Sequence, residues 1–252
     1  MNSKNNREVL EVFGEDSKKF LQGIITNDIS RLDQGPIYTA ILTPQGKYFI
    51  DFFIIPLQGR ILIDTTVDGS EDLINKLLQY RLRAKVDIKK TNLKVSMGVD
   101  NAPANSFKDP RHPALGWRSY ELKENNQEVD WKQLRVLYCI PETNIELVRD
   151  KTYILEAGFE RLNGVDFKKG CYVGQEITAR MQHKTKLKKG LKTVIIEGAA
   201  KVGTEILADG QNAGIIYSQS KGKGIAFLRL DRALPKMNAG NAVIFTEINK
   251  ES

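Results

Sequence analysis

One short segment of the chain combines residue types that could do chemistry. It runs from Lys169 to Glu176 and reads Lys-Gly-Cys-Tyr-Val-Gly-Gln-Glu. Gly170 and Gly174 lie on either side of the cysteine, so the backbone can turn sharply or approach a ligand beside its thiol. Neighbouring cations and a helix N-terminus both favour thiolate over thiol. The sequence therefore permits a reactive Cys171, although a lone cysteine is more often a small buried residue.

The elements around this segment must position it. Residues 175–181 could form the helix whose N-terminus faces the cysteine. Upstream, apolar periodicity predicts helices at 16–25 and 71–82. Alternating or continuous apolar runs predict strands at 9–14, 37–42, 48–55, 60–66, 86–88 and 93–97. Strands joined by hairpins and mixed with two helices favour an α+β fold.

The rest of the chain contains two regions that differ in composition. Residues 101–126 are rich in proline, glycine and asparagine and are expected to form loops, whereas 131–140 is apolar and suits either a strand or a helix. From residue 190 short strands recur between glycine-bearing turns, which is typical of a small sandwich or barrel. We therefore expect an N-terminal α+β segment at 1–100, a second α+β segment with the motif at 101–189, and a C-terminal β-barrel at 190–252.

Composition limits the classes of function. Two cysteines and two histidines, far apart, predict neither a disulfide framework nor a zinc site, so we expect no metal site. The net charge of +7 would favour an anionic partner, but it also suits an ordinary basic surface. No apolar run is long enough to span a bilayer, and the first residues lack a secretory or Arg- and Ser-rich transit signal. We therefore expect no membrane contact and a bacterial cytoplasmic location.

The segment from Lys169 to Glu176 resembles, position by position, the K-G-C-Y-x-G-Q-E signature of the YgfZ/GcvT-like folate-binding family. The flanking residues agree, and so do several stretches elsewhere. These further stretches are 20–28, 42–47, 80–86, 155–159, 163–167, 177–180, 214–218 and 224–228. The resemblance covers nearly all of the chain except the region 101–126.

This resemblance implies a fold and a role. The fold would be that of the glycine-cleavage aminomethyltransferase, with ferredoxin-like α+β units and a small C-terminal barrel around a tetrahydrofolate site. The role would be assembly or repair of iron–sulfur clusters, and through cluster enzymes tRNA thiolation. Cys171 would be the functional thiol, acting as a transient cluster ligand, a redox group or a one-carbon acceptor. Expected partners are folate and iron–sulfur assembly or client proteins.

The resemblance also implies a set of folate-binding residues. Glu156 falls where the aminomethyltransferases place a carboxylate that binds the pterin, and a carboxylate can accept two hydrogen bonds from a pterin edge. The full expected set is Asn27, Asp28, Asp51, Arg81, Arg83, Glu156, Lys169, Gly170, Tyr172, Gly174, Gln175, Glu176 and Arg180.

Several of these residues have structural alternatives. Asn27 and Asp28 could form an Asx turn, and Arg81 with Arg83 could sit on a solvated helix end. Tyr172 could fill the core. Asp51 and Glu156 could be structural acids.

One departure concerns catalysis. The aminomethyltransferases carry two adjacent aspartates after the hairpin, whereas this chain has Ile50 followed by Asp51. This replacement argues against aminomethyl transfer, the first alternative function, and leaves open whether the protein is an enzyme.

The second alternative function is an RNA-binding tRNA-modification factor. The basic run that would serve it consists of Arg180, His183, Lys184, Lys186, Lys188 and Lys189. No aromatic residues interleave with it, so we expect a solvated linker and no direct nucleic-acid binding. The Lys221–Gly224 segment is predicted to be a turn rather than a phosphate loop, and Cys139 a buried residue.

Overall fold

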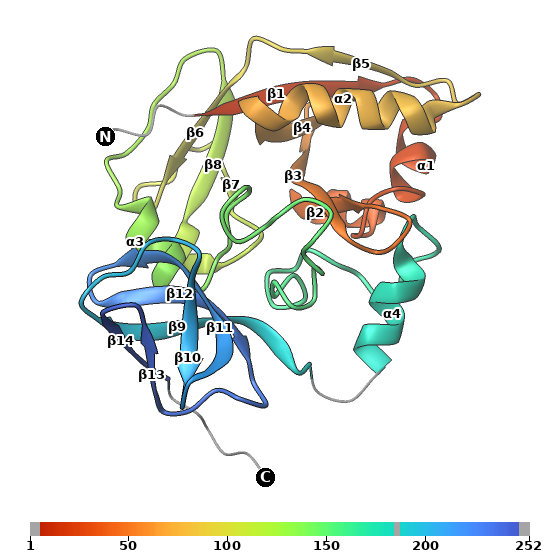
Figure 1. Ribbon diagram of the computed structural model, residues 1–252. Helices are drawn as coiled ribbons and strands as arrows, with labels where there is room; N and C mark the ends of the chain where they lie inside the picture. The colour runs from red at the N-terminus through yellow and green to blue at the C-terminus, as the bar shows by residue number, and fades with distance from the viewer. Residues whose placement is uncertain (1–5, 184–186, 247–252) are drawn as a thin grey trace. The chain divides into compact units, whose positions relative to one another are not determined.

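The structure is a computed structural model that describes residues 6–183 and 187–246, and they group into two compact units (Figure 1). The sheet unit comprises the described residues up to Val129 together with Phe159–Ile177. The barrel unit comprises Asp130–Gly158 and the described residues from Thr178 onward. The segment predicted at 101–189 is thus divided between the two units.

The sheet unit is built on a five-stranded antiparallel sheet with the order β2-β3-β4-β1-β5. Its strands are β1 (Arg7–Phe13), β2 (Ile37–Leu42), β3 (Tyr48–Leu57), β4 (Arg60–Thr66) and β5 (Asp87–Lys90). Two helices and a 3-10 helix share an apolar core with one face of this sheet. They are α1 (Ser17–Gln22), α2 (Val67–Arg81) and the 3-10 helix η1 (Ile29–Gln34).

Alternation along the strands decides which residues enter this core. Ile50, Phe52 and Ile54 of β3 pack with the helices, so the residues between them point to the opposite face of the sheet. Helix α2 begins earlier than predicted because Thr66 caps it: its Oγ1 accepts a hydrogen bond of 3.2 Å from the Gly69 amide.

The region predicted to be loops, 101–126, contains regular structure, which corrects that expectation. It supplies β7 (Phe107–Lys108), the 3-10 helix η2 (Pro113–Leu115) and β8 (Trp117–Glu121), and β8 joins β6 (Lys94–Gly98) in a three-stranded sheet. Four consecutive residues of β8, Trp117 to Tyr120, are buried although two of them are polar. The polar residues of this strand are buried together with its apolar ones. The strand therefore lacks the alternation of apolar and polar residues from which strands are predicted.

The barrel unit contains a closed barrel with the order β10-β11-β12-β9-β14-β13. Its strands are β9 (Lys189–Glu197), β10 (Thr204–Ala208), β11 (Gln211–Ser220), β12 (Lys223–Arg229), β13 (Lys236–Ala239) and β14 (Ala242–Phe245). The segment 131–140, which suited either a strand or a helix, contains helix α3 (Trp131–Leu137). It lies outside the barrel, where Val136 and Cys139 pack with Ile225 and Leu191. The buried position of Cys139 confirms its prediction.

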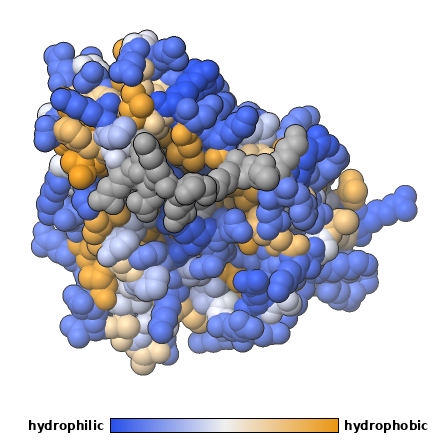
Figure 2. All heavy atoms as spheres, turned by 90° about the horizontal axis from the view of Figure 1, so that it is seen from below, coloured by the Kyte–Doolittle hydropathy of each residue, from blue (hydrophilic) through white to orange (hydrophobic). Residues whose placement is uncertain are grey.

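The last helix, α4 (Gln175–His183), begins in the sheet unit and continues into the barrel unit. Among the described residues, no helix is long and apolar enough to cross a membrane. On the face drawn in Figure 2, hydrophobic side chains are interspersed with hydrophilic ones.

Candidate functional site

The loop that carries the motif is anchored first at the residues just before it. Thr26 Oγ1 donates to the Gly164 carbonyl at 2.7 Å, and Asn27 Nδ2 donates to the Asn163 carbonyl at 2.8 Å. The Asp166 amide donates in turn to the Thr26 carbonyl at 3.0 Å. Asn27 is buried, and its side-chain amide joins the residues just before the motif loop to the segment that follows α1.

Lys169 provides the second anchor. Its Nζ donates to the carbonyls of Gln22 at 2.7 Å and Ile25 at 2.5 Å, and it lies 4.9 Å from the centre of the Tyr172 ring. Burial lowers the pKa of Lys169 to about 8, although the nearby carboxylates act in the opposite direction. The ammonium therefore satisfies backbone carbonyls at the C-terminal end of α1 rather than projecting towards solvent.

The far side of the loop is held by close packing against a hairpin. Gly174 has φ +81°, and a Cβ there would lie 2.5 Å from the Thr43 carbonyl oxygen. Gly46, in the same hairpin, would place a Cβ 2.7 Å from that of Ile177. Both positions need glycine because the two backbones touch.

Cys171 lies between these anchors and is exposed. Gly170 beside it has no neighbour within 4 Å of a built Cβ, which shows that this part of the loop faces open space. Tyr172 is buried, as the core alternative predicted. Helix α4 begins at Gln175, whose Nε2 is 3.4 Å from the Gly170 carbonyl. The loop thus holds an exposed thiol on a backbone fixed at both ends.

Asp51 belongs to the face of the main sheet that points away from the helices. The hydroxyl of Tyr48 donates to its Oδ1 at 2.6 Å, and that of Tyr38 donates to its Oδ2 at 2.9 Å. Ile50 points the other way into the apolar core and is only 2% exposed. A second carboxylate at position 50 would therefore be buried among aliphatic side chains, where its ionised form would carry a large desolvation cost.

Other predicted residues have local roles in the structure. Asp28 Oδ1 accepts from the Ser30 amide at 2.9 Å and caps η1, which is the Asx-type geometry that the sequence offered as an alternative. Arg81 pairs with the Asp87 carboxylate at 3.1 Å, and Arg83 is exposed after the end of α2. Neither of the two arginines is hydrogen-bonded to the motif loop in the described part of the chain.

The remaining predictions fall on α4 or in the barrel unit. Glu176 and Arg180 are exposed on α4. Glu156 is half-buried in the barrel unit, where its backbone carbonyl accepts from the Leu191 amide at 2.8 Å. Of the basic run, Lys184 and Lys186 lie outside the described residues. Among the described residues, no three or more His, Cys, Asp or Glu side chains are grouped so that they could hold a metal ion.

Sequence reasoning missed a buried ionic network in the sheet unit. Asp64 of β4 accepts from Arg118 Nη1 at 2.7 Å, from Arg7 Nε at 2.6 Å and from the Tyr120 hydroxyl at 3.0 Å. Asp109 then links Arg118, at 2.9 Å, to Arg111, which binds it through two nitrogens at 2.8 and 3.0 Å.

The same guanidinium groups also gather around one ring. Arg118, Arg111 and Arg7 lie 3.9, 4.8 and 5.5 Å from the centre of the Phe53 ring. One signal could have revealed this network: Asp64 interrupts the apolar strand sequence Ile-Leu-Ile-Asp, and a carboxylate inside a buried strand needs a cationic partner.

Comparisons with known proteins place this geometry in context. Residues 188–250 match the family model described as the CAF17 C-terminal beta-barrel domain. A mitochondrial protein of Neurospora crassa named as an iron–sulfur cluster assembly factor IBA57 homolog is 33% identical over 245 residues, which cover 81% of this chain and 55% of that protein. The human mitochondrial iron–sulfur cluster assembly factor IBA57 is 28% identical, over 89% of this chain and 76% of that protein. The chain thus spans little more than half the length of the fungal relative.

A solved structure supports the fold. The glycine cleavage system aminomethyltransferase T from Bartonella henselae superimposes with a TM-score of 0.73, covering 95% of this chain and 82% of that chain at 9% identity. The predicted α+β fold with a small C-terminal barrel is confirmed.

The predicted bacterial cytoplasmic location is wrong. The relatives are mitochondrial proteins of fungi and human, so they point to eukaryotic mitochondria. The prediction rested on the first residues of the sequence. A targeting segment directs a protein to its compartment and is not part of the folded domain. The sequence of the folded domain therefore does not indicate the compartment.

Proposed function

We propose that this chain is an iron–sulfur cluster assembly factor of the YgfZ/GcvT-like folate-binding family that presents the Cys171 thiol to a cluster held by a partner protein. Its similarity to proteins named as cluster assembly factors supports the role. The observation that carries the residue assignment is the exposed Cys171 on a loop anchored at Lys169 and at Gly174.

The chemistry follows from having one exposed thiol. Iron–sulfur clusters are usually held by four thiolates, and the chain has two cysteines, of which Cys139 is buried. Cys171 would therefore complete a coordination shell whose other ligands come from a partner, and the cluster would be cargo rather than a resident group. The anchored backbone limits the positions that the thiol can sample, which lowers the entropy lost when it becomes a ligand.

The test is genetic complementation in a Neurospora strain that lacks its own relative. We expect the wild-type chain, produced in mitochondria, to restore the activity of a cluster-dependent enzyme, and Cys171→Ser to restore little of it, because a hydroxyl is a poor cluster ligand. Cys139→Ala serves as the control, since it removes the buried thiol and keeps the exposed one. Full rescue by Cys171→Ser would show that the thiol is dispensable.

Tetrahydrofolate is the proposed small ligand. A hydrogen-bond acceptor suits this ligand: tyrosine hydroxyls orient both oxygens of the Asp51 carboxylate, and a carboxylate is a strong acceptor for the N–H groups of a reduced pterin. Tetrahydrofolate would supply or accept one-carbon units. Asp51 would orient it. Support for tRNA thiolation would be an indirect result of cluster delivery to the thiolating enzymes.

Calorimetric titration tests the folate proposal. We expect tetrahydrofolate to bind the wild-type protein and to bind Asp51→Asn at least about tenfold more weakly, since a charge-assisted hydrogen bond contributes roughly 1.5–3 kcal/mol. Asp87→Asn, which removes a carboxylate from a surface ion pair, should leave the affinity unchanged. Equal affinities for the wild type and Asp51→Asn would exclude Asp51 from the site, and no binding at all would refute folate as the ligand.

Aminomethyl transfer is less well supported as an activity. The similarity to the aminomethyltransferase, at 9% identity, concerns the fold. Ile50 occupies the core position where the paired carboxylate of that enzyme class would be expected.

A further inference from the structure

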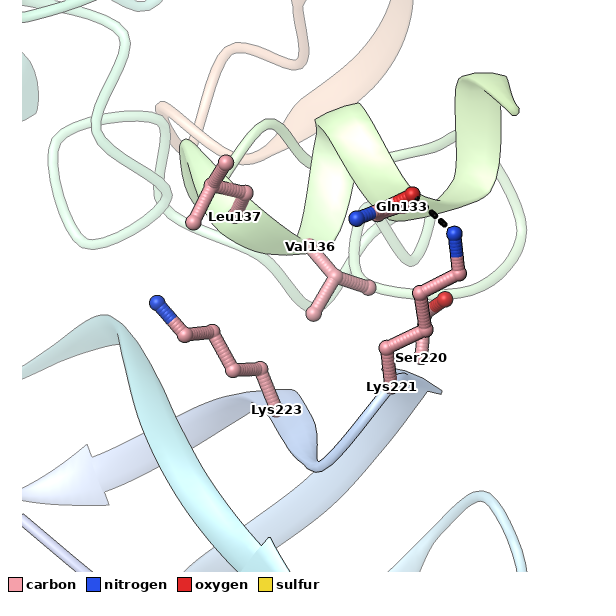
Figure 3. A pocket seen from close by; sticks show the side chains of 6 residues that line it. All are labelled: Gln133, Val136, Leu137, Ser220, Lys221 and Lys223. Atoms are coloured by element: carbon pink, nitrogen blue, oxygen red, sulfur yellow. Dashed lines mark hydrogen bonds between the residues drawn. The ribbon is translucent and has the colours of Figure 1, made fainter. Parts of the chain in front are cut away.

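A pocket of about 240 Å³ opens on the outside of the barrel unit, between α3 and the turn that joins β11 to β12 (Figure 3). Its lining consists of Gln133, Val136, Leu137, Ser220, Lys221 and Lys223. The turn is the Lys-Gly-Lys-Gly segment, in which Lys221 and Gly222 have φ +46° and +75°. Its prediction as a turn is confirmed, and it also brings two lysines to one pocket.

The wall on the helix side is apolar. Val136 is 1% exposed and points from α3 towards the turn, between the two lysines, in Figure 3. Leu137 on the same helix is 37% exposed. Ile195 of β9, the register partner of Lys223 on the neighbouring strand, is 46% exposed. Leu137 is therefore a lining aliphatic side chain that remains partly open to water, and Ile195 is an exposed aliphatic residue on the strand next to Lys223.

The charges at the pocket are cationic. Lys221 Nζ donates to Gln133 Oε1 at 2.5 Å and lies 3.5 Å from the Asp130 carboxylate, which fixes it at one end (Figure 3). Lys223 is half-buried, its ammonium points to the opposite end in Figure 3, and it forms no ion pair with another described residue. The one carboxylate, that of Asp130, pairs with Lys221, so Lys223 at the other end offers its charge to a ligand.

We propose that this pocket docks an acidic segment of a partner protein. The segment would place a carboxylate against Lys223 and an aliphatic side chain against Leu137, on the wall that Val136 forms beneath it. Charge complementarity selects an acidic partner, and the net charge of +7 would speed its approach. The apolar wall selects a protein, because protein interfaces join an apolar centre to a polar rim.

Nucleic acid fits this pocket less well. None of the described residues that line it is aromatic or an arginine, so these residues offer neither a stacking surface nor a bidentate phosphate contact. This inference does not depend on Cys171 or on folate, because no residue of the proposed site lines the pocket.

Fluorescence anisotropy with a defined probe tests the proposal. The probe is a fluorescein-labelled peptide of repeated Leu-Glu-Glu-Leu units, added to the full chain at moderate salt. We expect Lys223→Glu to weaken its binding about tenfold, since an attractive contact becomes a repulsive one, and Leu137→Ala to weaken it about threefold. The matched controls are Lys201→Glu and Leu207→Ala, which change exposed barrel residues outside the pocket and should leave binding intact.

Two altered peptides test the charged contact and the apolar contact separately. A peptide with Gln for Glu should lose the dependence on Lys223, and one with Ser for Leu should lose the dependence on Leu137. Equal weakening by Lys201→Glu would show unspecific charge attraction and overturn the proposal. Absence of peptide binding would also overturn it, as would tighter binding of oligouridylate that depends on Lys223.

Discussion

Asp64→Asn is expected to lower the free energy of unfolding by about 3–5 kcal/mol, because it removes a fully buried charge from an ionic network that is largely buried. Asp64 is the shared partner of Arg7 and Arg118, and Arg118 is itself buried. Without the carboxylate, Arg118 keeps only Asp109, and three guanidinium groups remain against one aspartate around the Phe53 ring. The low dielectric of this interior makes such unpaired charge costly.

Urea unfolding followed by circular dichroism measures this effect. Asp87→Asn is the matched control, since it breaks the ion pair with Arg81, in which both side chains are substantially exposed. Such surface pairs contribute at most about 1 kcal/mol, so the control should be nearly neutral. Similar losses in the two variants would mean that the network around Asp64 does not stabilise the sheet unit.

Gly174→Ala is expected to destabilise the protein by about 2–4 kcal/mol, from the left-handed backbone and from overpacking together. Its φ of +81° disfavours any side chain, and the new Cβ would lie 2.5 Å from the Thr43 carbonyl oxygen and 2.9 Å from the Leu42 Cβ. Relief requires the motif loop to move away from the hairpin. We therefore expect the variant to lose complementation as well as stability.

Gly170→Ala provides the control in the same loop. A Cβ at Gly170 meets nothing within 4 Å, and its φ lies outside the left-handed range. The change should alter the free energy of unfolding by less than about 0.5 kcal/mol. Thermal unfolding of the two variants under the same conditions makes the comparison, and equal stability of Gly174→Ala and the wild type would show that the close packing on the hairpin is not required.

Local patterns in the sequence determined much of the fold. The apolar runs at 37–42 and 60–66 became β2 and β4 with the same bounds, and the glycine-spaced strands after residue 190 became the barrel. These predictions succeeded because apolar periodicity and turn residues act within a few positions of each other along the chain. The motif from Lys169 to Glu176 also stood out by residue type alone, although its role remains a prediction.

The partners of polar residues were decided only by tertiary structure. The sequence places Arg118 in a region rich in turn residues, and only the fold brings it to Asp64, 54 positions earlier. For the same reason Lys169 was expected to bind a ligand, whereas its ammonium is committed to the carbonyls at the end of α1. The partner of a buried charge is the group that the fold places beside it. Because this partner is distant along the chain, the local pattern of apolar residues does not predict it.

The two faces of the main sheet depend both on the sequence pattern and on tertiary contacts. Alternation, which the sequence determines, puts Ile50 and Asp51 on opposite sides of β3. Only the packing of α1 and α2 on one side decides that Ile50 enters the core, while Tyr38 and Tyr48 fix the Asp51 carboxylate. The sequence by itself thus determined the strand and its candidate carboxylate. Tertiary contacts decided which face could do chemistry, because burial and hydrogen-bond partners come from residues distant along the chain.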